Sequence, residues 1–240
     1  MPRATQTRGT ARRAIDPAVS RNFGRKLRSW YRRNARDLPW RRTRDAYRVL
    51  VSELMLQQTQ VSRVVTRYDE FLTTFPTLAD VARAKPARVM EAWEGLGYYA
   101  RARNLHRLAT EVTKGGAAPH EMIPADTAAL RALPGVGAYT AGAVSSFAYE
   151  RRAALVDTNV ARVLKRVFAP TANVKSTKGQ RVVWSIAESI LPRTGRATWT
   201  HNQALMELGA LVCTARIAHC DRCPVRSMCR SAKPMTGSRS

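Results

Sequence analysis

Apolar residues recur at intervals of three and four positions along most of the chain, which is the spacing of one face of an α-helix. No segment shows the sustained alternation of apolar and polar residues, closed by tight turns, that marks a β-hairpin. The sequence therefore predicts an all-α fold. The predicted helices cover residues 23–31, 47–58, 61–75, 89–96, 102–112, 127–133, 140–149, 160–168, 179–190 and 198–212.

The chain is long enough to fold around a substantial core, because 240 residues with 45% hydrophobic content can bury a large apolar area. Short breakers of proline and glycine join the predicted helices, without a long linker or an internal repeat. Residues 1–20 are basic and lack apolar periodicity, which predicts a disordered arm. Residues 233–240 are polar and are predicted to form a frayed tail.

The charge is strongly unbalanced, with 41 Lys and Arg against 17 Asp and Glu and a formal net charge of +24. A nucleic acid is the natural partner, although an acidic membrane, ribosomal RNA or simply a high isoelectric point could accompany the same composition. No apolar run reaches the roughly 18 residues of a membrane span, and no secretory leader is recognisable. We therefore expect a cytoplasmic protein that binds no membrane. Residues 1–13 could be a phosphate-binding arm or imitate an organellar transit peptide.

All four cysteines lie near the C-terminal end, at Cys213, Cys220, Cys223 and Cys229, in the spacing C-x6-C-x2-C-x5-C. Since none is left over, we expect the thiols to form one shared ligand set. Thiolates bind zinc or hold an iron–sulfur cluster, and free structural thiols are the remaining alternative, since disulfides need an oxidising compartment. The uneven spacing does not match the two CxxC units of a paired zinc knuckle.

A glycine-rich turn, Leu-Pro-Gly-Val-Gly at 133–137, separates two short apolar helices. This is the helix-hairpin-helix pattern, in which glycines let backbone amides approach a DNA phosphate and the next helix start adds partial positive charge. The amides concerned are those of Gly135, Val136 and Gly137. A plain helical corner is the alternative, but it needs only one glycine.

Two acidic residues stand out by position. Asp157 follows the hairpin by about twenty residues and precedes a predicted helix, so its simplest role is a helix N-cap. Glu53 lies on the same helical face as Leu50, Leu54 and Gln57, where burial would raise the pKa of its carboxyl and let it donate a proton near neutral pH. An isolated Glu in such a place is more often solvated or ion-paired.

The sequence around Glu53 favours a functional role over this ordinary one. The segment 52–61 (SELMLQQTQV) closely resembles the corresponding part of the adenine DNA glycosylase (MutY) family, which belongs to the helix-hairpin-helix or endonuclease III superfamily. The segments 38–41 (LPWR), 95–105 (GLGYYARARNL) and 202–210 (NQALMELGA) resemble it too. The hairpin followed at this distance by an Asp is the superfamily's signature. Together with the cysteines, the resemblance covers about residues 25–232.

The resemblance implies a two-domain helical glycosylase fold. A six-helix barrel module with the hairpin would occupy 46–154, and a second helical domain would combine 21–45 with 155–232. The four cysteines would hold a [4Fe–4S] cluster in the loop 213–229. Double-stranded DNA with a mismatch or an oxidised base would lie across the cleft, and the target base would be flipped out of the stack to expose its glycosidic bond.

The family also implies residue roles. Glu53 would protonate the leaving adenine and then help to activate water. Asp157, kept ionised by helix-start amides, would stabilise the sugar cation, with a covalent stage as an option. Gln58 with Tyr98 or Tyr99 would wedge against the opposite base, unless these tyrosines belong to the core. The other implied site residues are Tyr139 and Asn159 beside the catalytic pair, Arg41 and Glu207 near the flipped base, and Gln57, Thr59, Gly135, Val136 and Gly137 on the DNA.

Bifunctional members such as endonuclease III carry after the hairpin a Lys that forms a Schiff base, whereas this chain has Tyr139 there, which predicts a monofunctional enzyme. We separately expect the protein to act as a monomer. Adenine glycosylases usually continue into a Nudix-like domain that inspects 8-oxoguanine, which is not expected here, so preference for that base is less expected. The string VDTN at 156–159, in place of the commoner VDGN, is a step towards the endonuclease III branch. A T:G or U:G mismatch glycosylase is therefore the alternative, and a catalytically silent DNA-binding protein is the third reading.

Overall fold

The computed structural model describes residues 15–114 and 123–232, and within these ranges the secondary structure is helical, with one isolated β-bridge between Cys213 and Ala218. The all-α prediction is confirmed. The α-helices are α1 (Pro17–Asn34), α2 (Ala46–Leu56), α3 (Val61–Thr74), α4 (Leu78–Arg83), α5 (Pro86–Ala92), α6 (Ala100–Lys114), α7 (Thr127–Ala132), α8 (Ala138–Phe147), α9 (Thr158–Phe168), α10 (Thr177–Ser189) and α11 (Gly195–Leu211). Short 3-10 turns lie at Pro39–Arg41, Cys220–Arg222 and Arg226–Met228.

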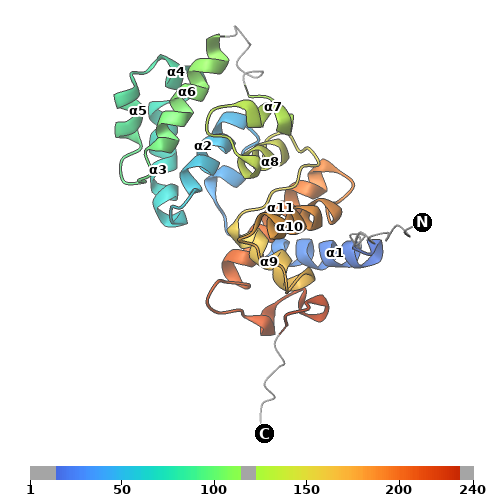
Figure 1. Cartoon of the computed structure of the whole chain (residues 1–240). Helices are drawn as coiled ribbons and strands as arrows, with labels where there is room; N and C mark the ends of the chain where they lie inside the picture. Colours follow the sequence, from blue (N-terminus) through green and yellow to red (C-terminus); the bar gives the residue numbers. More distant parts are fainter. Residues whose placement is uncertain (1–14, 115–122, 233–240) are drawn as a thin grey trace, which may run out of the picture.

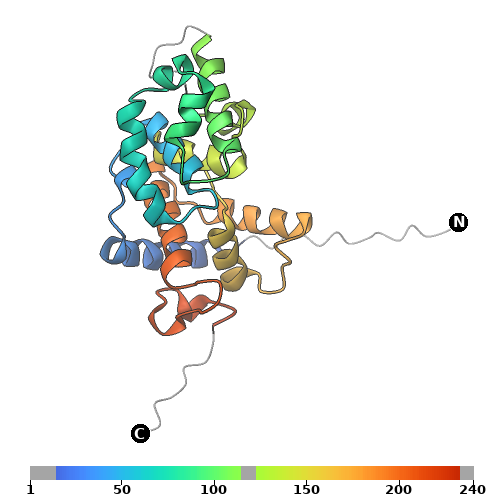
Figure 2. The same cartoon turned by 90° about the vertical axis from the view of Figure 1, so that its left-hand side faces the viewer.

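The helices form two lobes (Figure 1). One lobe contains α2 to α8, and the other combines the N-terminal α1 with α9, α10 and α11 and the loop that carries the cysteines (Figures 1 and 2). Helix α1 packs along α11, and α11 also packs on α9 and on α8, which ties the two lobes together. Among the described residues, one cluster of buried apolar side chains runs through both lobes.

Capping residues explain where the structure departs from the predicted helix bounds. Helix α1 begins at Pro17, because Asp16 caps the amides of Ala18 and Val19, so the predicted disorder to residue 20 is wrong for residues 17–20. Helix α4 was not predicted, since six residues hold too few turns for a periodic pattern, but Thr77 and Asp80 form a capping box at its start.

Helix α5 spans Pro86–Ala92, whereas the apolar spacing predicted a helix at 89–96. Pro86 suits the first helical turn, and Gly95, with a φ of 81°, lies in the left-handed region beyond the helix end. The described residues of the region 46–154 thus form α2 to α8, one helix more than expected. The rest of the predicted arm, residues 1–14, and the predicted tail, 233–240, lie outside the described residues. No described helix is long and apolar enough to cross a membrane.

Candidate active site

A cleft of about 1710 Å³ opens between the two lobes. Its walls come from the end of α2, the hairpin and start of α8, the start of α9, the middle of α11 and the segment before α2. Most of the residues singled out in the sequence line this cleft, although they are far apart in the chain. They are Arg41, Glu53, Gln57, Gln58, Thr59, Gly135, Gly137, Tyr139, Asp157, Asn159 and Glu207.

Glu53 is almost completely buried in the middle of α2, with 2% of its surface exposed. Its Oε2 accepts a hydrogen bond of 2.7 Å from the hydroxyl of Tyr139, which stands in the first turn of α8. The pKa of the Glu53 carboxyl is raised to about 7, because burial and, to a smaller extent, the nearby charge of Asp157 raise it, while the Tyr139 hydrogen bond and the charge of Arg41 oppose the rise. This carboxyl can therefore carry a proton near neutral pH.

Asp157 is the N-cap of α9, as the simplest interpretation of the sequence required. Its Oδ1 accepts a 2.6 Å bond from the Val160 amide, and its Oδ2 accepts a 3.3 Å bond from the side chain of Asn159. Burial raises the pKa of Asp157, and these hydrogen bonds to the charged form oppose the rise. Asp157 can cap α9 and still line the cleft, because one carboxylate oxygen faces the helix start and the other faces Asn159.

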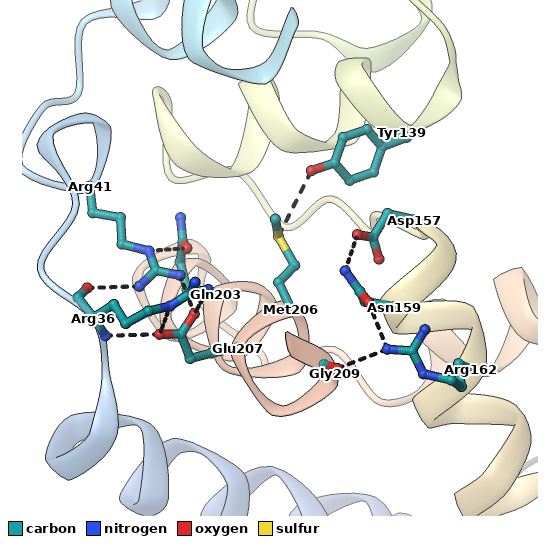
Figure 3. Close-up of polar contacts among 10 residues, drawn as sticks. All are labelled: Arg36, Arg41, Tyr139, Asp157, Asn159, Arg162, Gln203, Met206, Glu207 and Gly209. Carbon is teal, nitrogen blue, oxygen red and sulfur yellow. Dashed lines mark hydrogen bonds and ion pairs between the residues drawn. The ribbon is translucent and has the colours of Figure 1, made fainter. Parts of the chain in front are cut away.

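A chain of hydrogen bonds leads from Asp157 through Asn159 and Arg162 to Gly209 on α11 (Figure 3), and Arg162 also reaches the cysteine loop. Asn159 accepts a 2.6 Å bond from Arg162, whose guanidinium also donates to the carbonyls of Gly209 and Cys213, each at 2.8 Å. Gly209 allows this close approach, because a Cβ there would lie 2.7 Å from the Cβ of Asn159. The orientation of the Asp157 carboxylate thus depends on α11 and on the backbone of the loop.

Glu207 lies on the opposite side of Met206 from Asp157 (Figure 3). Arg36 donates three hydrogen bonds to it, from its backbone amide at 2.8 Å and its guanidinium at 2.9 and 2.8 Å, and Arg41 donates a fourth at 2.7 Å. Burial alone would raise the pKa of Glu207, but these bonds outweigh it and hold the pKa at about 2. A carboxylate accepts about four such bonds. Glu207 therefore anchors two arginines and has no free acceptor position for a base.

Two loops at the rim of the cleft carry the remaining predicted side chains. Loop 57–60 follows α2, and loop 95–99 precedes α6. Gln58 is exposed, and Tyr98 and Tyr99 are 60% and 40% exposed, so the alternative that these tyrosines belong to the core does not hold. The tyrosines do not line the main cleft but share two adjoining pockets with Gln58.

The hairpin between α7 and α8 has the predicted form. Gly135 adopts a φ of 76°, and its Cα faces Asn104 so closely that a Cβ would lie 2.6 Å from the Cβ of Asn104. Gly137 is the N-cap of α8 and has no side chain to cap the helix-start amides, which leaves them for an anion. Val136 differs from the two glycines, because its side chain is buried and its amide donates to the Leu133 carbonyl at 3.2 Å.

The four cysteines line one cavity of about 140 Å³ together with residues of α9 and the end of α11. They do not converge into a ready-made metal site within the described residues. The pKa of Cys223 is raised to about 11, chiefly by burial and to a smaller extent by the three other thiols, which therefore lie close enough to Cys223 to influence it. The cavity is several times the roughly 30 Å³ that one water occupies, which suits a multi-atom cluster with thiolate ligands better than a single ion.

Comparisons with known proteins agree with this geometry. Residues 51–188, more than half of the chain, match the family described as HhH-GPD superfamily base excision DNA repair protein. The chain belongs to this superfamily. Within it, the chain belongs to the adenine DNA glycosylase family: it is 44% identical over 205 residues to the adenine DNA glycosylase of Mycolicibacterium smegmatis, covering 85% of this chain and 67% of the relative.

Other similar proteins are longer or more distant. The human adenine DNA glycosylase is 44% identical over 226 residues, which cover 90% of this chain and 40% of the relative, so the chain spans about two fifths of the length of that protein. Among solved structures, a thermostable thymine-DNA glycosylase superposes with a TM-score of 0.79 at 29% identity, covering 90% of this chain and 97% of that one. An endonuclease III–DNA complex, at 23% identity and a TM-score of 0.72, shares the fold.

Four residues of this family member escaped the sequence reasoning although they organise the site. Arg162 could have been found, because it lies three positions after Asn159 on the same helical face. Gly209 carried a signal as an isolated glycine within a helical pattern. Arg36 carried none, since its role depends on the distant Glu207. Arg101 lay inside a resembling string but was not singled out.

Proposed function

We propose that the protein is a monofunctional DNA glycosylase that hydrolyses the N-glycosidic bond of adenine mispaired with G or 8-oxoguanine. The observation that carries the proposal is the placement of two buried carboxyls, Glu53 and Asp157, in one cleft between lobes of a helix-hairpin-helix fold. The identity to adenine DNA glycosylases supports the choice of base.

The chemistry follows from the difference between the two carboxyls. Protonated Glu53 donates its proton to a ring nitrogen of the flipped adenine, and the bond from C1′ to the base then breaks with its electron pair leaving on the adenine. The deoxyribose becomes an oxocarbenium-like cation, which the Asp157 carboxylate stabilises. Water adds to C1′, and the Glu53 carboxylate accepts the proton that the water loses. Tyr139 holds Glu53 in place through its 2.7 Å bond.

We expect base removal without strand cleavage, because Tyr139 stands where bifunctional members carry the lysine that forms the Schiff base. Lys165 and Lys175 also line the cleft, on the α9 side, where we assign them to phosphate contacts. Borohydride would trap a covalent complex with the mismatched duplex if either amine attacked the sugar, and we expect none.

The proposed partner is double-stranded DNA, bound by one copy of the protein. The start of α8 would hold a phosphate, the cleft lysines would hold the backbone, and the exposed Gln58, Tyr98 and Tyr99 would enter the duplex beside the mispair. In a cell, such an enzyme would act on the nucleoid in the cytoplasm.

The proposed cofactor is a [4Fe–4S] cluster on Cys213, Cys220, Cys223 and Cys229. When bound, it would cross-link the loop 213–229 and so hold the backbone to which Arg162 and Arg166 donate. Iron and sulfide analysis, together with the visible absorbance of a brown preparation, tests this assignment. A colourless protein with stoichiometric zinc would contradict it.

The decisive experiment incubates the protein with duplexes containing A:G, A:8-oxoguanine, T:G and U:G, followed by alkaline cleavage. We expect strand breaks at the adenines only after alkali, and none when Glu53→Gln or Asp157→Asn replaces the parent, while both variants keep their affinity for the duplex. Retained turnover in either variant would remove that residue from the mechanism. If the parent and both variants were inert on every duplex but bound DNA alike, the protein would be a silent DNA-binding member.

The second candidate is removal of thymine or uracil opposite G. It is favoured by the 29% identity to a thymine-DNA glycosylase over 97% of that chain. Cleavage of T:G or U:G but not A:G in the same panel would establish it and overturn the adenine assignment.

A further inference from the structure

A buried guanidinium lies beneath loops 57–60 and 95–99. Arg101 is the second residue of α6 and is 7% exposed. On one side, its Nη1 donates to the carbonyls of Leu54, Met55 and Gln57 at 2.7, 2.8 and 2.6 Å. These carbonyls belong to the C-terminal end of α2, where helix carbonyls lack partners within the helix. Arg101 therefore caps α2 and fixes the first residue of loop 57–60.

The other side of the same guanidinium holds loop 95–99. Nη2 donates to the carbonyls of Leu96 and Gly97 at 3.0 and 2.8 Å, and Nε donates to the Tyr98 carbonyl at 3.3 Å. Nη2 also reaches the hydroxyl of Thr59 at 3.2 Å, and that hydroxyl bonds the Leu96 carbonyl at 3.2 Å. One planar group and one threonine thus join two loops that lie almost forty residues apart in the sequence.

The backbone of both loops is held in the left-handed region. Gln58 has a φ of 55° and Tyr98 a φ of 48°, and they are two of the three non-glycine residues with positive φ in the described ranges. Such conformations persist only where the surroundings impose them, and they concentrate at functional sites. The bonds from Arg101 supply that constraint, because they fix the Gln57 carbonyl directly before Gln58 and the Gly97 and Tyr98 carbonyls on the two sides of Tyr98.

We propose that Arg101 is a positioning residue that joins loops 57–60 and 95–99 into one rigid wedge, so that Gln58 and Tyr98 enter the duplex together as the target base leaves the stack. The inference rests on the proposed glycosylase function. The hydrogen-bond acceptors of Arg101 in the described residues are carbonyls and one hydroxyl, so its fork geometry sets these contacts. Its guanidinium also lies over the rings of Trp93 and Tyr98, at 5.6 and 5.5 Å from their centroids. Lysine would retain the charge but present its donors from one point, which cannot span both loops.

The test separates wedge insertion from general stability by changing the DNA. One duplex has a single A:G mispair in paired surroundings, and a second has mismatched neighbours on both sides, so that its adenine is already loosely stacked and costs less to extrude. Single-turnover rates at saturating protein are measured for the parent, Arg101→Lys, Arg101→Gln and Thr59→Val. Arg88→Gln is the matched control, because it removes one arginine from an exposed ion pair with Glu91.

For the paired duplex, we expect Arg101→Lys and Arg101→Gln to lower the rate by about 100-fold, the size of loss that small misplacements produce, and Thr59→Val by about tenfold. For the loosened duplex, all three should stay within about threefold of the parent, since little extrusion remains to be assisted. Arg88→Gln should match the parent on both. If Arg101→Gln does not fold, as thermal unfolding would show, Arg101→Lys and Thr59→Val decide the outcome.

An equal loss on both duplexes, or no loss on either, would overturn the positioning role while leaving the glycosylase proposal intact. Failure of the parent on both duplexes would instead refute the adenine glycosylase assignment itself. The two failures are therefore distinguishable in one experiment.

Discussion

The hydroxyl of Tyr139 donates a 2.7 Å hydrogen bond to Oε2 of Glu53, which joins the helix after the hairpin to the buried carboxyl on α2. The bond has two effects. It orients the carboxyl towards the cleft, and it stabilises the charged form against a burial that raises the pKa to about 7. Tyr139 is itself partly buried, and desolvation raises its own pKa well above the ordinary value, so the phenol remains the donor at all working pH values.

The first prediction concerns the pH profile. If protonated Glu53 is the general acid, kcat/KM should fall about tenfold per pH unit above pH 7. Tyr139→Phe removes a bond to the carboxylate, so the pKa of Glu53 should rise and the alkaline limb should move up by about one pH unit. Rates on an A:G duplex between pH 5 and 9 check this. Tyr47→Phe, in the first turn of α2, loses a 2.7 Å bond to the Phe75 carbonyl and none to Glu53, so it should leave the limb in place. A limb that moves equally in both variants would contradict the assignment.

The second prediction concerns stability. The pKa of Glu53 is about 7 in the folded protein and 4.5 as the reference, so the unfolded chain loses its proton first as pH rises. The free energy of unfolding should therefore fall between pH 4.5 and 7 and stay low above that range. Glu53→Gln removes the charge and can still accept from Tyr139, so at pH 8 it should be more stable than the parent by about 3 kcal/mol. Urea unfolding at pH 5 and pH 8 measures both; a variant less stable than the parent at pH 8 would contradict it.

The sequence predicted much of this site because its signals are local. Helical spacing gave the fold class, the turn at 133–137 gave the hairpin, and resemblance gave Glu53 and Asp157 their places. Helix α4 was missed because a short helix depends on its caps, Thr77 and Asp80, more than on periodicity.

The buried contacts of Glu207 and of Arg101 were missed for a different reason. Glu207 was expected beside a flipped base, but its partner Arg36 is 171 positions away in the chain, and nothing local marks such a pair. The same holds for Arg101, whose acceptors are backbone carbonyls that any sequence possesses. Spacing can show where a helix presents a side chain, but it cannot show which distant group satisfies it.

The third prediction concerns the contacts of Glu207 with Arg36 and Arg41. Glu207 is fully buried, so Glu207→Gln leaves the buried guanidinium of Arg41 without its counter-charge and should cost about 3 kcal/mol of unfolding free energy at pH 7. Because the pKa of Glu207 is about 2 in the folded protein and 4.5 as the reference, its contribution is complete above pH 4.5 and is lost as pH falls towards 2. Denaturant titrations of parent and variant should therefore converge in acid.

The matched control for Glu207→Gln is Glu91→Gln, which breaks the exposed ion pair with Arg88. That change should stay within about 0.5 kcal/mol of the parent at pH 7, since both partners are mostly solvated. Equal effects of the two substitutions would mean that burial of Glu207 adds nothing to the pair.

The fourth prediction tests whether the orientation of the Asp157 carboxylate depends on α11. A Cβ at Gly209 would lie 2.7 Å from the Cβ of Asn159 and 3.2 Å from its backbone, which cannot yield as a flexible side chain can. Gly209→Ala should push the start of α9 away and turn the Asp157 carboxylate, so kcat should fall by about 100-fold. Gly24→Ala in α1 is the control, because the added methyl would come too close only to the far end of the flexible Arg28 side chain and would meet His201 at an ordinary contact distance of 3.6 Å. Single-turnover rates and thermal unfolding are measured together. Activity lost only in proportion to unfolded protein would show that Gly209 serves packing alone. Activity lost in a fully folded variant would show that α11 sets the orientation of the Asp157 carboxylate.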